Sequence, residues 1–332
     1  MVSWLGAVQA QDYPGALWSL GLRLPGSTAA AIEQAVTEKT IVRTWSMRGT
    51  LHFVAAEDAR WMLSLMTPRI IAGAALRSQR LELDSQTFSR SFQVLTDVLQ
   101  GGEPLMRKDA LDRLEKAGIS TAGQRGYHIL WRAAQEGLVC LGPIQGKQHT
   151  FVLLDDWLPP GRILSREESL AEIARRYFTS HGPATLQDFL WWTGLTAADG
   201  RAALEMASPG LVQETIDRRV YWTASALPEI PPPSSAAYLL PGFDEYLLGY
   251  KDRSAVLDPA HVSKIIPGGN GVFMPTLVID GRVAGTWKRT LQKKTVPITF
   301  SPFAPLTDAE HLLAEAAAER YRDFLALPSP AA

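Results

Sequence analysis

The feature that most constrains the fold is an order of elements that recurs three times along the chain. In residues 1–80, 81–160 and 161–227, segments with helical spacing of apolar residues are followed by two short runs rich in β-branched and aromatic residues. Apolar spacing near 3.6 indicates amphipathic helices, and paired β-branched runs across a polar or glycine turn indicate a hairpin. Helices followed by a hairpin are typical of a winged helix module. The sequence therefore predicts three tandem winged helix modules.

The individual elements follow from the same periodicities, from caps and from glycine stops. The predicted helices cover 16–20, 29–36, 92–99, 105–116, 124–136, 167–177, 186–192 and 197–206. The predicted hairpins pair 41–45 with 50–54, 138–141 with 150–154, and 211–214 with 220–223.

The last third of the chain departs from this repeat. Four prolines within residues 228–235 predict a stiff linker. Beyond it, residues 236–327 are strand-rich, with a hairpin predicted across Asp280-Gly281 and a closing helix over 308–325. The expected fold class is α+β, mainly α, in which three modules line one concave surface and are joined to this C-terminal region.

Composition bounds the class of protein. A chain of 332 residues exceeds one ordinary core, and 46% hydrophobic with 20% charged residues is the balance of a soluble globular protein. No apolar run approaches the roughly 18 to 20 residues that would span a bilayer, so no membrane segment is expected. The single Cys140 excludes an intrachain disulfide and favours a reducing cytoplasm.

Common catalytic signatures are absent from the sequence. No P-loop, Rossmann glycine pattern, nucleophile elbow or zinc helix motif occurs, and the six histidines lack ligand spacing. We therefore expect no metal and no nucleotide cofactor. Tandem winged helix modules instead favour duplex DNA as the partner. Because the net charge is only -1, attraction must come from local patches, and residues 39–56 and 281–307 carry bases but no acids.

Two glutamines near the start of the chain stand out. Gln9 and Gln11 flank Ala10 just before a helix start marked by Asp12 and Pro14. In an extended segment, residues two apart point to the same side, so Ala10 would pack inward while both amides face a shared spot. The alternative is that the amides cap helix ends or bond to backbone.

Four blocks in order, residues 9–12, 43–54, 239–253 and 285–289, resemble the bacterial winged helix family that contains the AlkZ and YcaQ DNA glycosylases. The resemblance spans nearly the whole chain. It implies three winged helix modules around duplex DNA and an activity that removes alkylated purines and unhooks interstrand crosslinks. The family usually has a further helical segment before its first motif, so the first module is expected to be short here.

The resemblance also implies catalytic residues. The family motif is Gln, an apolar residue, then Gln in the AlkZ branch or Asp in the YcaQ branch, and Gln9 with Gln11 matches the AlkZ form. N7 alkylation makes guanine a cationic leaving group, so no general acid is needed. Neutral amides would then position a water against an oxocarbenium-like C1′.

DNA contacts are expected from the two basic patches. His52 has three readings: a phosphate contact, a residue that orients Gln11, or a structural histidine. An internal ion network is expected from Asp244, Glu245 and Arg253. The residues predicted to contact DNA are Arg43, Arg48, His52, Trp287, Lys288, Arg289, Lys293 and Lys294.

The sequence thus predicts a DNA glycosylase acting on N7- or N3-alkylated purines, as a monomer in the cytoplasm near the nucleoid. A non-catalytic winged helix DNA-binding protein or regulator is the alternative, and a protein interaction scaffold is a third reading.

Overall fold

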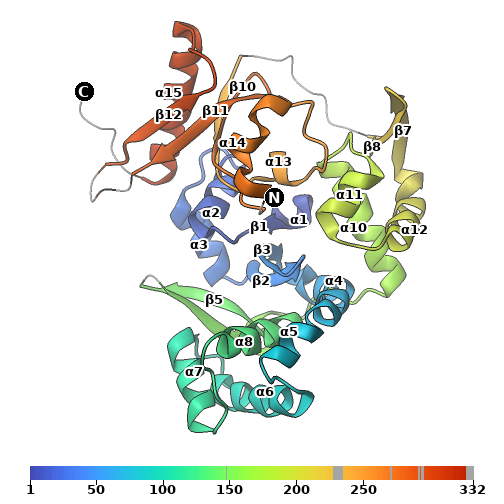
Figure 1. Cartoon of the computed structure of the whole chain (residues 1–332), viewed down its shortest axis with the longest axis vertical. Helices are drawn as coiled ribbons and strands as arrows, with labels where there is room; N and C mark the ends of the chain where they lie inside the picture. Colours follow the sequence, from blue (N-terminus) through green and yellow to red (C-terminus); the bar gives the residue numbers. More distant parts are fainter. Residues whose placement is uncertain (147, 227–234, 270, 291, 293–294, 327–332) are drawn as a thin grey trace.

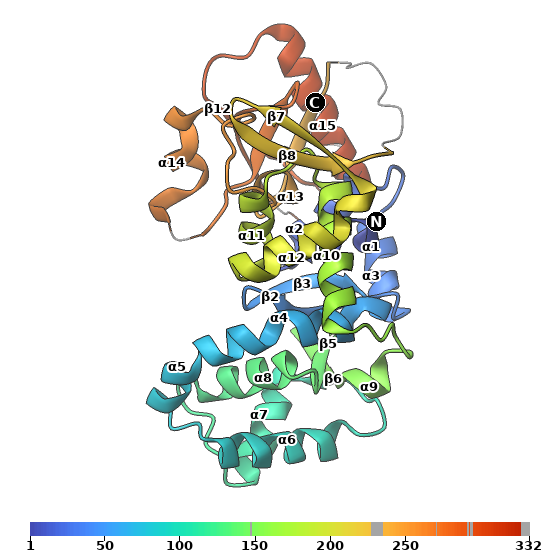
Figure 2. The same cartoon turned by 90° about the vertical axis from the view of Figure 1, so that its right-hand side faces the viewer.

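The computed structural model describes residues 1–146, 148–226, 235–269, 271–290, 292 and 295–326. The fold is α+β and mainly α, as expected. Figures 1 and 2 show the C-terminal strands with helix α15 at one end of the long axis and helices α6 and α7 at the other. The predicted linker lies outside the described residues except for Ser235.

The first segment follows the predicted order. Asp12 is the N-cap residue of α2, and Pro14 lies in the first turn of that helix. Arg48 and Gly49, both at positive φ, form the turn between β2 and β3. The elements of this first segment are α1 (Val2–Leu5), β1 (Val8–Gln9), α2 (Tyr13–Gly21), α3 (Ala29–Thr37), β2 (Ile41–Met47) and β3 (Thr50–Ala55).

Residues 56–157, which run from the end of the first predicted module through the second, contain a long helix that the sequence pattern did not indicate. This helix, α4, has Pro68 in its interior and buries seven of its residues. The elements of residues 56–157 are η1 (Ala56–Asp58), α4 (Ala59–Gly73), α5 (Ala75–Arg80), α6 (Ser85–Leu99), β4 (Leu105–Met106), α7 (Arg107–Lys116), α8 (Arg125–Gln135), β5 (Val139–Gln145), β6 (Gln148–Leu153) and α9 (Leu154–Trp157).

The first two hairpins belong to one sheet. Its strand order is β1-β3-β2-β5-β6-β4, and the hairpins meet where Arg43 of β2 is opposite Leu141 of β5. Strand β1 is an edge strand, antiparallel to β3, with Gln9 opposite His52. The two expected modules therefore share a sheet, and the glutamine pair lies at its edge.

The third segment forms the predicted helices and a separate hairpin. Capping boxes start α10 at Ser165 and α11 at Thr185. Its elements are α10 (Arg166–Ser180), α11 (Leu186–Thr193), α12 (Ala197–Ala207), η2 (Ser208–Gly210), β7 (Leu211–Ile216) and β8 (Arg219–Ala224).

The C-terminal region is a four-stranded sheet with the order β12-β11-β10-β9. The predicted turn at Asp280-Gly281 joins β10 to β11, and Ile279 is opposite Arg282. Its elements are β9 (Ala237–Leu240), α13 (Glu245–Leu248), η3 (Pro259–His261), α14 (Val262–Ile265), η4 (Pro267–Gly269), β10 (Thr276–Ile279), β11 (Arg282–Arg289), β12 (Ile298–Pro302) and α15 (Asp308–Phe324).

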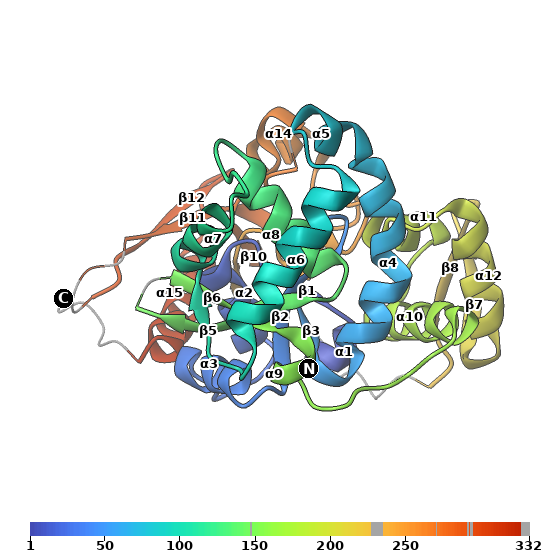
Figure 3. The same cartoon turned by 90° about the horizontal axis from the view of Figure 1, so that it is seen from below.

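The two faces of the six-stranded sheet pack on different parts of the chain. Val42 and Val54 face a core shared with α4 and α10, and Figure 3 shows α4 between the sheet and α10. Phe53, one residue from Val54, faces the opposite core. That core joins α2 to the C-terminal region, where Trp18 packs against Tyr321 with ring centroids 4.9 Å apart. Strand β1 is therefore enclosed by segments from three parts of the chain.

Candidate active site at the sheet edge

Gln9 and Gln11 lie on either side of a buried alanine. Ala10 is fully buried, and its N–H donates to the carbonyl of Leu51 at 2.7 Å. Its carbonyl accepts from Arg43 Nε at 2.9 Å. Gln9 is 8% exposed, whereas Gln11 is exposed. Ala10 is therefore inward, as expected, whereas the convergence of both amides on one shared spot stays a prediction.

Both amide oxygens are held by protein donors. Gln9 Oε1 accepts from Arg48 Nη2 at 3.3 Å, and Gln11 Oε1 accepts from the Leu51 N–H at 3.3 Å. Because a guanidinium and a backbone N–H can only donate, these contacts fix which end of each amide is the oxygen. Neither glutamine caps α2, but Gln11 does bond to backbone, as the alternative interpretation allowed.

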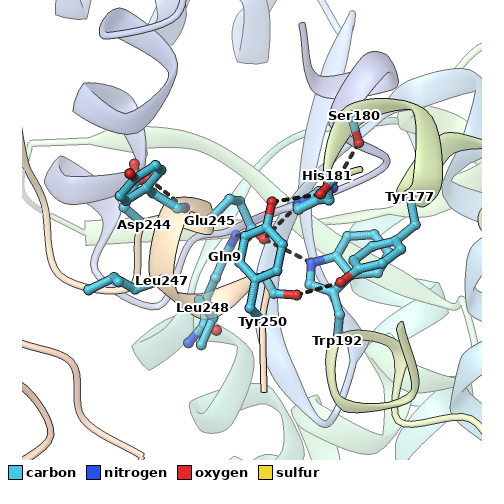
Figure 4. Close-up of polar contacts among 12 residues, drawn as sticks. Gln9, Tyr177, Ser180, His181, Trp192, Asp244, Glu245, Leu247, Leu248 and Tyr250 are labelled. Atoms are coloured by element: carbon cyan, nitrogen blue, oxygen red, sulfur yellow. Dashed lines mark hydrogen bonds and ion pairs between the residues drawn. The ribbon is translucent and has the colours of Figure 1, made fainter. Parts of the chain in front are cut away.

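A buried carboxylate holds the backbone at Gln9. Glu245 Oε1 accepts from the Gln9 N–H at 3.2 Å, and Oε2 accepts from Trp192 Nε1 at 2.8 Å (Figure 4). His181 Nε2 lies 3.5 Å from Oε2. Burial alone would raise the pKa of Glu245, but His181, Arg48 and the Trp192 hydrogen bond hold it below its usual value. The carboxylate is therefore ionised.

Aromatic side chains surround this carboxylate. The Tyr177 hydroxyl donates to the Gly249 carbonyl at 2.8 Å, and the Tyr250 hydroxyl donates to the His181 carbonyl at 2.7 Å (Figure 4). The Tyr177 and His181 rings stack with centroids 4.7 Å apart. These contacts tie the ends of α10 and α11 to α13, with Gln9 at the junction.

Arg48, expected to contact DNA, points toward Gln9. Besides the amide oxygen, its guanidinium donates to the carbonyl of Trp192. Burial lowers the pKa of Arg48, and the charge of Glu245 opposes that effect. Arg48 also lines a cavity of about 680 Å³ with Arg69 and Arg166. It therefore connects Gln9 to a cationic recess between α4 and α11.

Three other residues expected to contact DNA are buried. Arg43, 4% exposed, binds Ala10 and lies 2.6 Å from His149 Nε2. His52 is fully buried, and burial and Arg48 lower its pKa to about 3, so the structural reading holds for this residue. Trp287, 2% exposed, donates to the Leu240 carbonyl. The expectation that these three side chains contact DNA directly is therefore wrong, because protein groups already enclose them.

The basic hairpin is only partly described. Lys288 is exposed on β11, whereas Arg289 donates to the Tyr321 hydroxyl and lies over that ring. Lys293 and Lys294 lie outside the described residues. Among the described residues, the hydrogen bonds of Gln9 go to Glu245 and Arg48 and not to this hairpin.

Asp244, Glu245 and Arg253, which were expected to form one ion network, each bond to a different part of the protein. Asp244 pairs with Arg23 at 2.7 Å, whereas Glu245 reaches β1. Arg253 donates to the Leu247 carbonyl and lies over the Trp191 ring. The role of Glu245 at Gln9 was missed, although its place within the third of the four resemblance blocks was a usable signal.

The family model described as DNA glycosylase AlkZ-like matches residues 2–324. The chain belongs to the AlkZ-like DNA glycosylase family. It is therefore an enzyme of the DNA glycosylase class, as the resemblance implied.

Two comparisons agree with membership of the AlkZ-like family. An interstrand DNA cross-link repair glycosylase from Streptomyces sahachiroi is 29% identical over 333 residues, covering 94% of this chain and 85% of that protein. The solved structure of the Streptomyces sahachiroi DNA glycosylase AlkZ matches with a TM-score of 0.80 at 23% identity. It covers 99% of this chain and 92% of that one, and shows the same fold.

Two features are absent from the described part of this AlkZ-like chain. Within the described ranges, no group of three or more His, Cys, Asp or Glu residues could hold a metal ion. In the same part of the chain, no helix is long and apolar enough to cross a membrane.

Proposed function

We propose that this enzyme hydrolyses the N-glycosidic bond of N7- or N3-alkylated purines in duplex DNA, including purines joined in interstrand crosslinks. The observation that carries the proposal is the pair of anchored amides, Gln9 and Gln11, at the sheet edge in the order of the family motif. The crosslink repair glycosylase of Streptomyces sahachiroi, 29% identical, supports the substrate class.

The chemistry fits neutral amides. As the bond between C1′ and the base nitrogen breaks, its electron pair neutralises the cationic alkylated base, so no acid is required. Water then forms a bond to C1′ and releases a proton to solvent. Each amide oxygen accepts one protein hydrogen bond and keeps a second lone pair for water. Held in place beforehand, the two amides orient that water at little entropic cost.

The DNA-binding surface belongs to the same proposal. We infer that duplex DNA lies along one concave side of the three modules, with Lys288 contacting phosphate and the recess lined by Arg48 and Arg69 adding positive charge near Gln9. A monomer without a nucleotide cofactor suffices for this reaction, and we place it at the nucleoid.

The test is a base excision assay on duplex DNA that contains N7-methylguanine, repeated on a crosslinked duplex at fixed salt. Gln9→Ala and Gln11→Ala should each lower single-turnover release about a hundredfold, the loss typical of one oriented hydrogen bond. Duplex Kd should stay within twofold.

Gln34→Ala is the matched control because Gln34 is exposed on α3 and bonds only to Glu38. It should release base at the wild-type rate. A wild-type protein that binds duplex DNA but releases no N7- or N3-alkylated purine would overturn the proposed function and favour a non-catalytic DNA-binding role.

A further inference from the structure

The backbone of Gln9 has an outward-facing donor that the sheet cannot satisfy. Among the described strands, β1 pairs only with β3, and it is the N–H of Ala10 that bonds across to Leu51. The Gln9 N–H points away from the sheet, where an edge strand normally meets water. Here the carboxylate of Glu245, 236 positions away in the sequence, accepts from it at 3.2 Å.

Glu245 is placed so that a neutral amide could not replace it fully. Its two oxygens each accept from a donor, Gln9 N–H on one side and Trp192 Nε1 on the other. A glutamine would offer one acceptor oxygen and turn an NH2 group toward the other donor. Because the carboxylate is 2% exposed, water cannot easily repair that mismatch.

Arg48 fixes the orientation of the Gln9 side-chain amide, just as Glu245 fixes the Gln9 backbone. Its guanidinium donates both to Gln9 Oε1 and to the carbonyl of Trp192. Arginine has no acceptor, so the amide oxygen must face Arg48 and the NH2 group must face away. The nitrogen Nε2 donates to no described residue, and it is not among the fully buried polar atoms without a partner. It is therefore open to an incoming group.

We propose that Glu245 and Arg48 are positioning residues that fix the backbone and the amide of Gln9, so that its NH2 group is presented to an acceptor on the damaged nucleotide. The inference rests on the proposed function for its catalytic consequence. The charges support it, because the Glu245 carboxylate balances the partly buried Arg48 guanidinium beside it. Gln9 would then act as a donor to DNA, while both amide oxygens keep a lone pair for water.

The first experiment measures hydrogen exchange at the Gln9 backbone amide by NMR, in wild type, Glu245→Gln and Asp244→Asn. Glu245→Gln should raise the exchange rate of this amide at least tenfold. Asp244→Asn is the matched control, because Asp244 is equally buried and ion-paired but contacts Arg23 and Ser19. Its Gln9 amide should exchange at the wild-type rate, since asparagine can still cap α13.

The second experiment compares single-turnover base release with duplex Kd. Glu245→Gln and Arg48→Lys should lower the release rate tenfold or more with Kd within threefold, because lysine cannot bond Gln9 and Trp192 together in a fork. Gln9→Glu keeps an acceptor oxygen for water but lacks the NH2 group, so it should release base at least tenfold more slowly than wild type. If Glu245→Gln does not fold, Arg48→Lys and Gln9→Glu decide the question.

The outcomes separate this inference from the proposed function. Wild-type release and exchange rates in folded Glu245→Gln and Arg48→Lys would overturn the positioning roles, and a fully active Gln9→Glu would overturn the donor role. If the wild-type enzyme releases no alkylated purine, the proposed function fails. The amide exchange of Glu245→Gln then still decides whether Glu245 holds Gln9.

Discussion

At the scale of single residues, the segment between the two glutamines is fixed through the carbonyl of Ala10. Arg43 binds the Ala10 carbonyl, and its Nη1 lies 2.6 Å from His149 Nε2. Because arginine only donates, the His149 nitrogen accepts and its ring is neutral. Burial and the charge of Arg43 lower the pKa of His149 to about 4.

This pairing predicts a loss of stability in acid. In the unfolded chain His149 takes up a proton near the ordinary histidine pKa of 6.5, whereas the folded state resists protonation until about pH 4. The free energy of unfolding should therefore fall as pH drops from 6.5 to 4, with no contribution above 6.5. Partial exposure limits the effect to about 1 kcal/mol.

Urea unfolding at pH 7 and pH 5 measures this effect. His149→Gln keeps an acceptor for Arg43 without a titrating ring, so it should lose less stability than wild type over that interval. Equal losses in the two proteins would show that His149 does not titrate differently on folding.

Gln11 gives a second prediction at this scale. Asp is the residue that the resemblance implies for the YcaQ branch, and a carboxylate can still accept from the Leu51 N–H and from water. Gln11→Asp should therefore retain base release at least tenfold faster than Gln11→Ala in single-turnover assays. Identical rates for the two variants would contradict a role for the acceptor oxygen.

At the scale of elements, helix α2 near the start of the chain packs against α15 near its end. Trp18 of α2 lies against Tyr321 and Phe324 of α15, with ring centroids 4.9 Å and 5.0 Å away. Gly21 at the end of α2 faces the same Phe324 ring, which a Cβ atom would overlap. Strand β1 depends on this packing because it leads directly into α2.

Gly21→Ala should therefore destabilise the protein by about 1 to 3 kcal/mol, the usual cost of overpacking a core. Gly73→Ala is the control, because Gly73 also ends a helix and its Cβ would meet no atom within 4 Å. That variant should be neutral or slightly stabilising. Thermal unfolding of both variants measures the difference, and an equal Tm would contradict tight packing of α2 on α15.

At the scale of the whole molecule, the charges that remain available for DNA are fewer than the sequence indicates. Of the eight residues expected at the interface, Arg43, His52 and Trp287 are enclosed by protein, and Arg48 and Arg289 already bond protein groups. Lys288 stays exposed on β11. Among the described residues expected at this hairpin, Lys288 is therefore the cation available to phosphate, whereas Lys293 and Lys294 lie outside the described part of the chain.

Lys288→Ala should weaken duplex binding about equally for all sequences and reduce the slope of log K against log salt by about one. Lys116→Ala removes the same charge outside both basic patches and should leave the slope unchanged. Fluorescence anisotropy at several salt concentrations measures both slopes. A Lys288→Ala slope equal to wild type would remove this residue from the interface.

The sequence by itself determined the helices and hairpins of the predicted repeat and the glutamine motif, but it gave no signal for α4. The cap at Asp12, the Asp280-Gly281 turn and the 3.6-residue periodicities predicted helices and hairpins that the structure contains. The alternation around Ala10 likewise predicted its burial. Such features were predictable because neighbouring residues set them through backbone geometry and local hydrogen bonds.

Only the tertiary structure decided which groups meet at Gln9. The pairing of β2 with β5 and the contact from Glu245 to Gln9 join residues far apart in sequence, and no local period encodes them. A basic residue in the sequence also does not reveal whether its partner is DNA or protein. Arg43 and Arg48 were assigned to DNA on charge alone, but burial gave their guanidinium groups protein acceptors because an unpaired buried charge is costly.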